Sequence, residues 1–345
     1  MAEKTRDTGI DVMRGIAVFT MVSANLAGSV LAEPHPLWLR FFGTFAAPFF
    51  VMLSGMMVAS GASGKGYGLT HYLVRGALVM AMGVLIDVII IWRIAPFMTV
   101  DVLYLIGLSL PIAYLFGKLP LSLKVVVILA IIGVTPYLVS MLGYADYPSE
   151  IGILGGEGVE GEHNTSVLSH WLVDGWFPIF PWLAVALFGT LLAELRQARK
   201  SFADPQIVLG AFVLFFAGAA LWAAYPGALM TRDGYSEMFY EATPGFIVTS
   251  LGLAVLIFAA VDINPKVASL APFAVFGEAA LAMYCLHLVF IDHVIVPLIS
   301  ADDLTTYVGE YAALLAVLQV IGWGIRRLKQ SWKTRPFIVR FLIGG

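Results

Sequence analysis

The chain has 345 residues, of which 60% are hydrophobic and only 12% are charged, and its mean hydropathy is +0.89. A soluble domain carries about twice that charged fraction, so the composition excludes a soluble fold and predicts an all-α, polytopic membrane protein. The net charge of -3 and the lack of a basic patch give no indication of nucleic-acid binding. The single cysteine, Cys285, excludes an intramolecular disulfide and a cysteine-based metal site.

Apolar runs of membrane-spanning length follow one another along the chain and predict about ten transmembrane helices. Lipid offers the backbone amides no other hydrogen-bonding partner, so each run is predicted to be helical. The runs lie near residues 14–32, 38–60, 72–92, 98–117, 122–142, 177–195, 206–225, 243–262, 270–292 and 306–325. The run 98–117 is the weakest, because it contains Asp101 and Pro111. The whole chain, 1–345, is predicted to form a single transmembrane domain.

Ten spans place both termini on the same side of the membrane, and the basic residues indicate which side. With cytoplasmic termini, 17 of the 20 lysines and arginines face inward, and only Arg40, Arg93 and Arg232 face outward. The positive-inside rule favours this orientation. A cleaved signal peptide is not expected, because the first apolar run is about 18 residues long and acidic residues precede it. We therefore expect a retained first span and cytoplasmic termini.

The first predicted hairpin keeps polar residues that lipid tolerates poorly, which makes them functional candidates. Arg14 and Asn25 are eleven residues apart, so they share one helix face and lie about 16 Å apart, near the two bilayer boundaries. His35 follows just beyond the helix, and an imidazole can take a proton near neutral pH. The structural alternatives are snorkelling or pairing with Asp11 for Arg14, a helix–helix hydrogen bond for Asn25, and an interfacial loop position for His35.

The start of the third predicted span carries a second basic pair. His71 and Arg75 are four residues apart and therefore share a helix face at one leaflet. Together with Arg14 they are candidates for a clamp that binds phosphate from the cytoplasmic side. The alternative for Arg75 is ordinary positive-inside anchoring.

Acidic residues gather on the predicted outer side. Asp87 and Asp101 flank a short outer loop that contains Arg93, and an ion pair there is the structural alternative to a functional role. The longest outer loop, 143–176, contains Asp146, Glu150, Glu157, Glu160, Glu162, His163, His170 and Asp174. These residues are expected to solvate the surface, or alternatively to form a rim that attracts a basic or amine-bearing acceptor.

The ninth predicted span, 270–292, contains Glu278, Tyr284 and His287. Tyr284 and His287 are three residues apart and share a helix face. An intramembrane His–Glu pair is also expected in a proton-coupled secondary transporter of a small polar solute. That function stays open as the alternative, although the internal repeats common in transporters are not found.

Four segments resemble one known family, that of the heparan-α-glucosaminide N-acetyltransferase catalytic domain, within the wider transmembrane acyltransferase superfamily. They are DVMRGIAVFTMVSANL at 11–26, PFFVMLSG at 48–55, WFPIFPWLAVALFG at 176–189 and FGEAALAMYCLHLVF at 276–290. An outer-loop histidine, His35, lies between the first two. The family includes many bacterial membrane proteins, and its members use acyl-CoA, typically acetyl-CoA. The resemblance covers most of the chain and is most specific in the first hairpin.

The resemblance implies His35 as the catalytic residue, Asn25 at the preceding helix end, acyl-CoA as the donor substrate and no metal. The expected reaction moves an acetyl group from cytoplasmic acetyl-CoA to an amine or hydroxyl of an extracytoplasmic amino-sugar or glycan acceptor. Direct transfer and an acyl-His intermediate both stay open. The expected location is a bacterial cytoplasmic (inner) membrane, with the lipid bilayer and, for assembly, a homodimer as further partners. Heparan sulfate is not carried over, because most bacterial members have no established acceptor.

Overall fold

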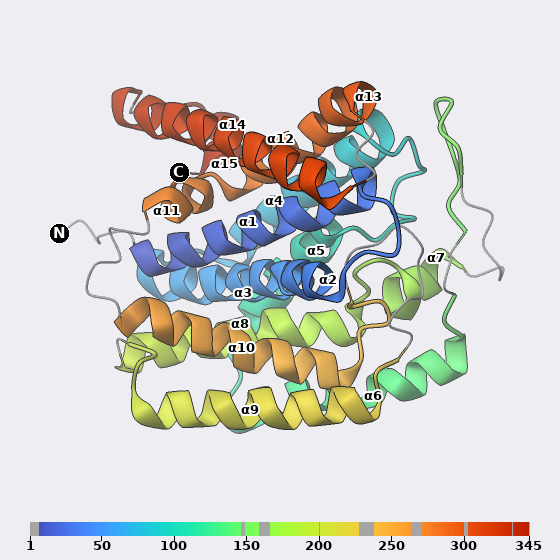
Figure 1. Cartoon of the computed structure of the whole chain (residues 1–345). Coiled ribbons are helices and arrows are strands. Elements are labelled where there is room, and N and C mark those ends of the chain that lie inside the picture. Colours follow the sequence, from blue (N-terminus) through green and yellow to red (C-terminus); the bar gives the residue numbers. More distant parts are fainter. Residues whose placement is uncertain are drawn as a thin grey trace. The chain divides into compact units, whose positions relative to one another are not determined.

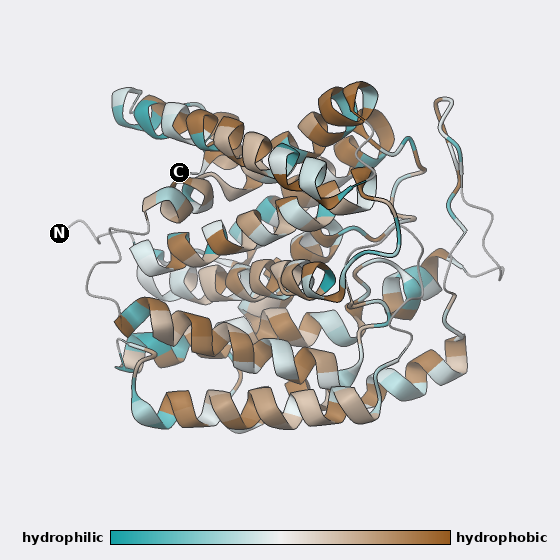
Figure 2. Ribbon diagram, in the orientation of Figure 1, coloured by the Kyte–Doolittle hydropathy of each residue, from teal (hydrophilic) through white to brown (hydrophobic). Residues whose placement is uncertain are grey.

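The computed structural model describes residues 7–145, 149–158, 166–199, 201–227, 238–263, 271–299, 303–332 and 334–344. Within these residues the chain is helical and contains no strand, only an isolated bridge between Ile94 and Gly152. Nine helices of this described part are long and apolar enough to cross a membrane. Figure 2 shows one of them, α9, as apolar over most of its length. The predicted all-α, polytopic class is therefore confirmed.

The helices of membrane-spanning length begin and end near the predicted runs. They are α1 (Thr8–Val30), α2 with α3 (Leu37–Thr44 and Ala46–Lys65), α4 with η1 (Leu69–Leu85 and Ile86–Ile90), α6 (Leu121–Leu142), α8 (Ile179–Arg199), α9 (Pro205–Ala224), α10 (Pro244–Ile263), α12 with η4 and α13 (Ala280–Phe290, Ile291–Ile295 and Val296–Leu298) and α14 (Leu304–Ser331). Shorter elements are α5 (Val102–Phe116), α7 (Val167–Ser169), η2 (His170–Asp174), α11 (Ala271–Glu278) and α15 (Phe337–Ile343). The weak predicted run 98–117 corresponds to α5, which has only 15 residues.

The chain divides into two compact units. Unit 1 comprises Met1–Phe49, Gly234–Met238 and Ile257–Gly345, and unit 2 comprises Phe50–Asp233 and Phe239–Leu256. The single domain expected over 1–345 stays a prediction.

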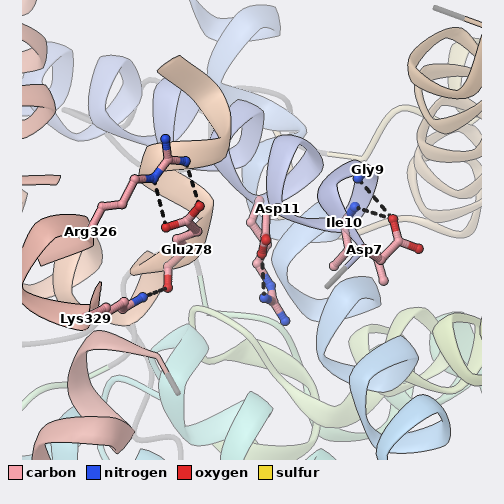
Figure 3. Close-up of polar contacts among 8 residues, drawn as sticks. Asp7, Gly9, Ile10, Asp11, Glu278, Arg326 and Lys329 are labelled. Atoms are coloured by element: carbon pink, nitrogen blue, oxygen red, sulfur yellow. Dashed lines mark hydrogen bonds and ion pairs between the residues drawn. The ribbon is translucent and has the colours of Figure 1, made fainter. Parts of the chain in front are cut away.

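In unit 1, α1 lies beside α11, as Figure 1 shows. The two backbones approach closely at glycines: a Cβ atom at Gly15 would overlap the Phe273 carbonyl, and one at Gly277 would overlap the Asp11 carbonyl. Small residues allow such contact between helices in a membrane, where tight packing replaces the hydrophobic effect. Helix α1 begins at a cap in which the Asp7 carboxylate accepts hydrogen bonds from two backbone N–H groups (Figure 3).

In unit 2, too, helix backbones approach each other closely at glycines. A Cβ atom at Gly76 on α4 would overlap the Gly107 carbonyl on α5, and one at Gly55 on α3 would overlap the Ala186 carbonyl on α8. Helices α9 and α10 lie side by side (Figure 1), with Gly218 against the backbone of α10. The glycines thus set which helices of unit 2 pack together.

One expectation about the fold is wrong: the run 270–292 is not a single helix. It consists of α11, which ends at Glu278, and α12, which begins at Ala280, with Ala279 in a non-helical conformation (φ -128°, ψ 37°). At the break the Lys329 ammonium on α14 donates a hydrogen bond to the Glu278 carbonyl oxygen at 2.7 Å. Hydropathy does not register such a break, because the apolar run continues across it.

Candidate active site

The polar face of α1 forms as predicted, since α1 runs without interruption from Thr8 to Val30 and carries both Arg14 and Asn25. At 1.5 Å per residue they are about 16 Å apart along the helix. Arg14 Nη1 lies 3.5 Å from Asp11 Oδ1. Arg14 thus forms the ion pair with Asp11 that was the structural alternative for it. Phosphate binding by Arg14 stays a prediction.

Asn25 is joined to His287, a residue from the far end of the sequence. Asn25 Nδ2 lies 2.8 Å from His287 Nε2, and His287 is fully buried on α12. The other ring nitrogen, His287 Nδ1, lies 3.1 Å from the Met283 carbonyl oxygen. Tyr284 packs edge-on against the His287 ring, with ring centroids 5.6 Å apart, so these two residues share a face as expected.

These contacts assign the proton of His287. A carbonyl oxygen can only accept, so Nδ1 carries the proton and donates to Met283. In the neutral ring Nε2 is then an acceptor, and it receives a hydrogen bond from the Asn25 amide. This fixes the orientation of the amide and leaves its second N–H and its carbonyl oxygen for a ligand.

Helix α14 holds this part of α1 in place. The Tyr307 hydroxyl donates to the Ser23 carbonyl at 3.0 Å and also lies 2.6 Å from the Ser23 hydroxyl. The Tyr311 hydroxyl donates to the Phe19 carbonyl at 2.8 Å. These hydrogen bonds lie two and six residues before Asn25, so they support the helix segment that presents it. This support could not be predicted from the sequence, because both tyrosines lie in an ordinary apolar run.

His35 is almost completely buried, between α1 and α2 in the sequence. His35 Nε2 lies 2.9 Å from the carbonyl oxygen of Leu31, the C-cap residue of α1. Because that oxygen only accepts, Nε2 carries the proton, and the neutral ring keeps its lone pair on Nδ1. Nδ1 is therefore the atom of His35 that can accept a proton.

Glu278 and His287 do not pair with each other. Glu278 forms a bidentate ion pair with Arg326 on α14, with Oε1–Nη2 and Oε2–Nε distances of 2.6 and 3.1 Å (Figure 3). His287 instead pairs with Asn25. Glu278 thus connects α11 to α14, whereas His287 belongs to the asparagine site.

In unit 2, His71 and Arg75 lie within the first two turns of α4, as expected. The His71 ring stacks on Tyr67, with centroids 4.0 Å apart and planes 17° apart, and the Lys65 ammonium lies 5.7 Å from the Tyr67 ring centroid. The Lys118 ammonium lies 4.5 Å from the ring of Tyr114, which in turn packs against Tyr72. We call Lys65, Tyr67, His71, Arg75 and Lys118 the basic aromatic cluster. Arg14 belongs to unit 1, so a joint clamp with it stays a prediction.

Asp87 and Asp101 lie close together at the N-terminal end of α5, whereas Lys118 of the basic aromatic cluster follows its C-terminal end. The Thr99 hydroxyl donates to Asp87 Oδ2 at 2.8 Å and lies 3.3 Å from the Asp101 backbone nitrogen. Asp101 also caps α5, since its carboxylate accepts from the Val102 N–H at 2.6 Å. All three polar residues are buried. Asp101 therefore has a structural role that accounts for its position.

The acidic loop 143–176, which is predicted to lie on the outer side, is only partly a solvated surface. His170 and Asp174 are completely buried and Glu150 nearly so, which contradicts the surface role expected for them. Glu157 lies on the exposed part. Asp146, Glu160, Glu162 and His163 lie outside the described residues. No described group of three or more His, Cys, Asp or Glu side chains could hold a metal ion, and the absence of a metal stays a prediction.

An imidazole with a free lone pair and an oriented amide N–H are groups that can serve acyl transfer, as a base and as an oxyanion donor. Residues 6–219 match the family described as heparan-alpha-glucosaminide N-acetyltransferase, catalytic. The chain belongs to this family, as the resemblance had predicted, and it is a membrane acetyltransferase. A search of curated proteins finds no match. The family match contains Arg14, Asn25, His35, His71 and Arg75, whereas Glu278, Tyr284 and His287 lie beyond it.

Proposed function

We propose that this enzyme transfers an acetyl group from cytoplasmic acetyl-CoA to an amine or hydroxyl of an extracytoplasmic, sugar-containing acceptor. The observation that carries the proposal is the Asn25–His287 hydrogen bond inside a helical membrane fold. It holds a neutral amide N–H donor in an environment of low polarity, where stabilisation of a developing oxyanion is strongest. Family membership supplies the acetyl chemistry.

The basic aromatic cluster supplies the binding site for the donor nucleotide. Its cations suit the phosphates of CoA, and the stacked Tyr67 and His71 rings offer a planar surface for the adenine. Tyr67 is 37% exposed, so a ligand can reach it. Most basic residues are cytoplasmic in the predicted orientation, and this cluster lies on that side.

In the chemical step the acceptor nitrogen or oxygen attacks the thioester carbon. The bond from that atom to the acyl carbon forms, the carbon–sulfur bond breaks, and CoA leaves as the thiolate. His35 Nδ1 takes the proton that the acceptor loses and returns it to the thiolate. The second N–H of Asn25 donates to the oxyanion of the tetrahedral intermediate, a role that contributes about 3–4 kcal/mol in other acyl-transfer enzymes.

The proposed function includes an orientation of the chain in the membrane. Both termini are cytoplasmic and the membrane is the bacterial inner membrane, so the acetyl group reaches the outer side while CoA stays inside. The exposed apolar side chains of the described helices suit contact with lipid. A homodimer stays a prediction.

The direct test replaces His35 in purified protein and measures acetyl-CoA turnover with a panel of amino sugars. We expect His35→Ala to lose most of the activity, because Nδ1 is the proton acceptor. His293→Ala is the control, since His293 is exposed and pairs with Asp292 at the surface. Full activity of His35→Ala would remove His35 from the mechanism.

The transporter alternative loses its main support. It needed a His–Glu pair in the membrane. Both oxygens of the Glu278 carboxylate instead accept hydrogen bonds from Arg326. Proton-coupled uptake of a sugar into liposomes without acetyl-CoA would restore it.

A further inference from the structure

Helix α15 carries exposed apolar side chains although it is too short to cross a membrane. It has 7 residues, Phe337–Ile343, and packs against α12 within unit 1. Phe341 is buried, whereas Phe337 and Ile338 are 56% and 51% exposed. A membrane span needs about 20 residues, so this exposed apolar pair is not explained by a transmembrane position of its helix.

The same part of the chain carries charge of one sign. No Asp or Glu follows Glu310, whereas the chain as a whole has 23 acidic and 20 basic residues. The basic residues that follow Glu310 are Arg326, Arg327, Lys329, Lys333, Arg335 and Arg340. A cluster of lysines and arginines directly beside a membrane-spanning helix attracts anionic lipids.

The length of α14 places this charge beyond the hydrocarbon core of a bilayer. Its 28 residues extend about 42 Å, whereas the core is about 30 Å thick. Arg326, Arg327 and Lys329 lie in the last two turns, and Figure 2 shows α14 as hydrophilic at one end. Trp323 and Trp332 are 42% and 40% exposed, and exposed tryptophans are typical of the level of the lipid headgroups.

Polar contacts fix α15 beside the break between α11 and α12. The Arg335 guanidinium donates to the Lys329 carbonyl at 2.9 Å, and the Lys329 ammonium donates to the Glu278 carbonyl (Figure 3). A Cβ atom at Gly344 would overlap that same Glu278 carbonyl. Helix α15 is therefore part of the packed unit 1, and its exposed residues follow directly on the charged end of α14.

Arg340 is the cation of α15 that is available to a ligand. It is exposed, and it forms no ion pair or hydrogen bond with the described residues. Arg326, Lys329 and Arg335, by contrast, all have partners in the protein. Arg340 follows Phe337 by three residues, so the two side chains share one helix face.

A cation beside exposed apolar side chains matches the region of a phospholipid where the phosphate meets the acyl chains. The positive-inside rule accounts for the basic residues but not for the exposure of Phe337 and Ile338. A water-soluble phosphate would account for Arg340 but not for the apolar pair. An anionic phospholipid accounts for both features, and its net charge complements that of the segment after Glu310.

We propose that α15 forms a binding site for an anionic phospholipid in the cytoplasmic leaflet. Arg340 binds the headgroup phosphate, and Phe337 and Ile338 insert between the acyl chains. Only the choice of leaflet rests on the proposed function, through its cytoplasmic termini. Binding of the lipid does not depend on acetyl transfer.

The test follows thermal unfolding of the full chain in a non-ionic detergent while a lipid is titrated. The lipids are phosphatidylglycerol and phosphatidylcholine with identical acyl chains, and glycerol 3-phosphate represents a soluble phosphate. Arg340→Gln removes the charge and keeps much of the side chain. The double variant Phe337→Ser and Ile338→Ser removes the apolar contact and keeps the charge.

Two matched controls lie outside α15. Arg199→Gln removes an arginine that is also exposed but pairs with Asp204. Leu298→Ser removes an exposed apolar side chain at the end of α13. Neither change should alter the response to lipid.

We expect phosphatidylglycerol to raise the Tm of the wild type by about 2–4 °C at saturation. Phosphatidylcholine and glycerol 3-phosphate should have no such effect, because each lacks one half of the matching chemistry. Arg340→Gln should shift the midpoint of the titration to an about fivefold higher lipid concentration. The double variant should shift the midpoint in the same direction.

Three results would overturn the inference. The first is equal stabilisation by the two phospholipids. The second is stabilisation by glycerol 3-phosphate as large as that by phosphatidylglycerol, which would indicate a site for a soluble anion. The third is an unchanged midpoint in the α15 variants; Arg340→Gln alone decides this point if the double variant does not fold. No measurement here uses acetyl-CoA, so a failure of acetyl transfer would refute the proposed function and leave the lipid site standing.

Discussion

In His287 and His35 of unit 1, a contact with a backbone carbonyl oxygen indicates which ring nitrogen carries the proton. The two rings differ in whether the other nitrogen is left to accept a proton. His287 donates through Nδ1 and accepts from Asn25 through Nε2, so both ring nitrogens are engaged. His35 donates through Nε2 and keeps the lone pair on Nδ1. His35 can therefore act as a base, whereas His287 positions the asparagine.

Removal of the Asn25 side chain should slow the chemical step. We expect Asn25→Ala to lower kcat by about 100- to 1,000-fold, because the oxyanion loses a donor, and to leave KM for acetyl-CoA nearly unchanged. Thr8→Ala on the same helix is the control, since Thr8 is exposed at the other end of α1. A large rise in KM with unchanged kcat would show that Asn25 binds the donor instead.

His287 should act through Asn25. His287→Phe removes the acceptor that orients the amide, so its kcat should fall, by less than that of Asn25→Ala. The double variant should be no slower than Asn25→Ala alone, because the two residues form one unit. Additive losses in this double-mutant cycle would mean that His287 has a separate role.

Sequence patterns find polar residues in apolar runs, but they do not find their partners. Arg14, Asn25 and His35 were predicted from their spacing within one hairpin. The Asn25–His287 contact joins residues 262 positions apart, and only the packing of α1 against α12 brings them together. His170 and Asp174 looked like ordinary loop residues, because burial of a loop cannot be read from its composition.

At the scale of elements, the break between α11 and α12 is stabilised by side chains of α14. Glu278 ends α11 and binds Arg326, and the Lys329 ammonium caps the Glu278 carbonyl. The predicted helices agree with the structure where hydropathy alone decides them. The break depends on a tertiary contact and on the close approach of Gly277 to α1, so a local pattern could not predict it.

Glu278→Gln should therefore affect stability more than catalysis. We expect a loss of about 1.5–3 kcal/mol, the value of hydrogen bonds to a charged group, with kcat for acetyl transfer retained. Thermal unfolding in detergent measures the first and acetyl-CoA turnover the second. Arg326→Gln should reproduce the loss, whereas Arg327→Gln, at an exposed position, should not. Loss of activity at unchanged stability would favour a catalytic or relay role for Glu278.

The stability that the N-terminal cap of α14 contributes should depend on pH. Hydrogen bonds from the Thr306 hydroxyl and from the backbone N–H groups of Thr306 and Thr305 hold the pKa of Asp303 below its ordinary value. The stabilisation is thus present above the ordinary pKa of about 3.9 and disappears as the pH falls through the lowered one. Asp303→Ala should lower the Tm by about 2 °C at pH 7 and have no effect near pH 2. Gln330→Ala, at an exposed position of α14, is the control, and an effect that is constant with pH would contradict this account.

At the scale of the whole molecule, composition was sufficient to predict a polytopic helical membrane protein, because lipid permits few other structures. Nine described helices are long and apolar enough to cross a membrane, and the shorter α5 lies in the predicted run 98–117. The orientation rests on the distribution of basic residues. The division into two units was not predictable, since it arises from contacts between distant helices.

In the proposed reaction an acetyl group crosses the membrane while its CoA carrier does not. The most direct measurement uses proteoliposomes with glucosamine enclosed and radiolabelled acetyl-CoA added only outside, with the protein oriented by its accessible termini. We predict labelled N-acetylglucosamine inside vesicles whose protein has its cytoplasmic face outward, and none with His35→Ala. Labelled product that forms only when donor and acceptor share one compartment would contradict the account.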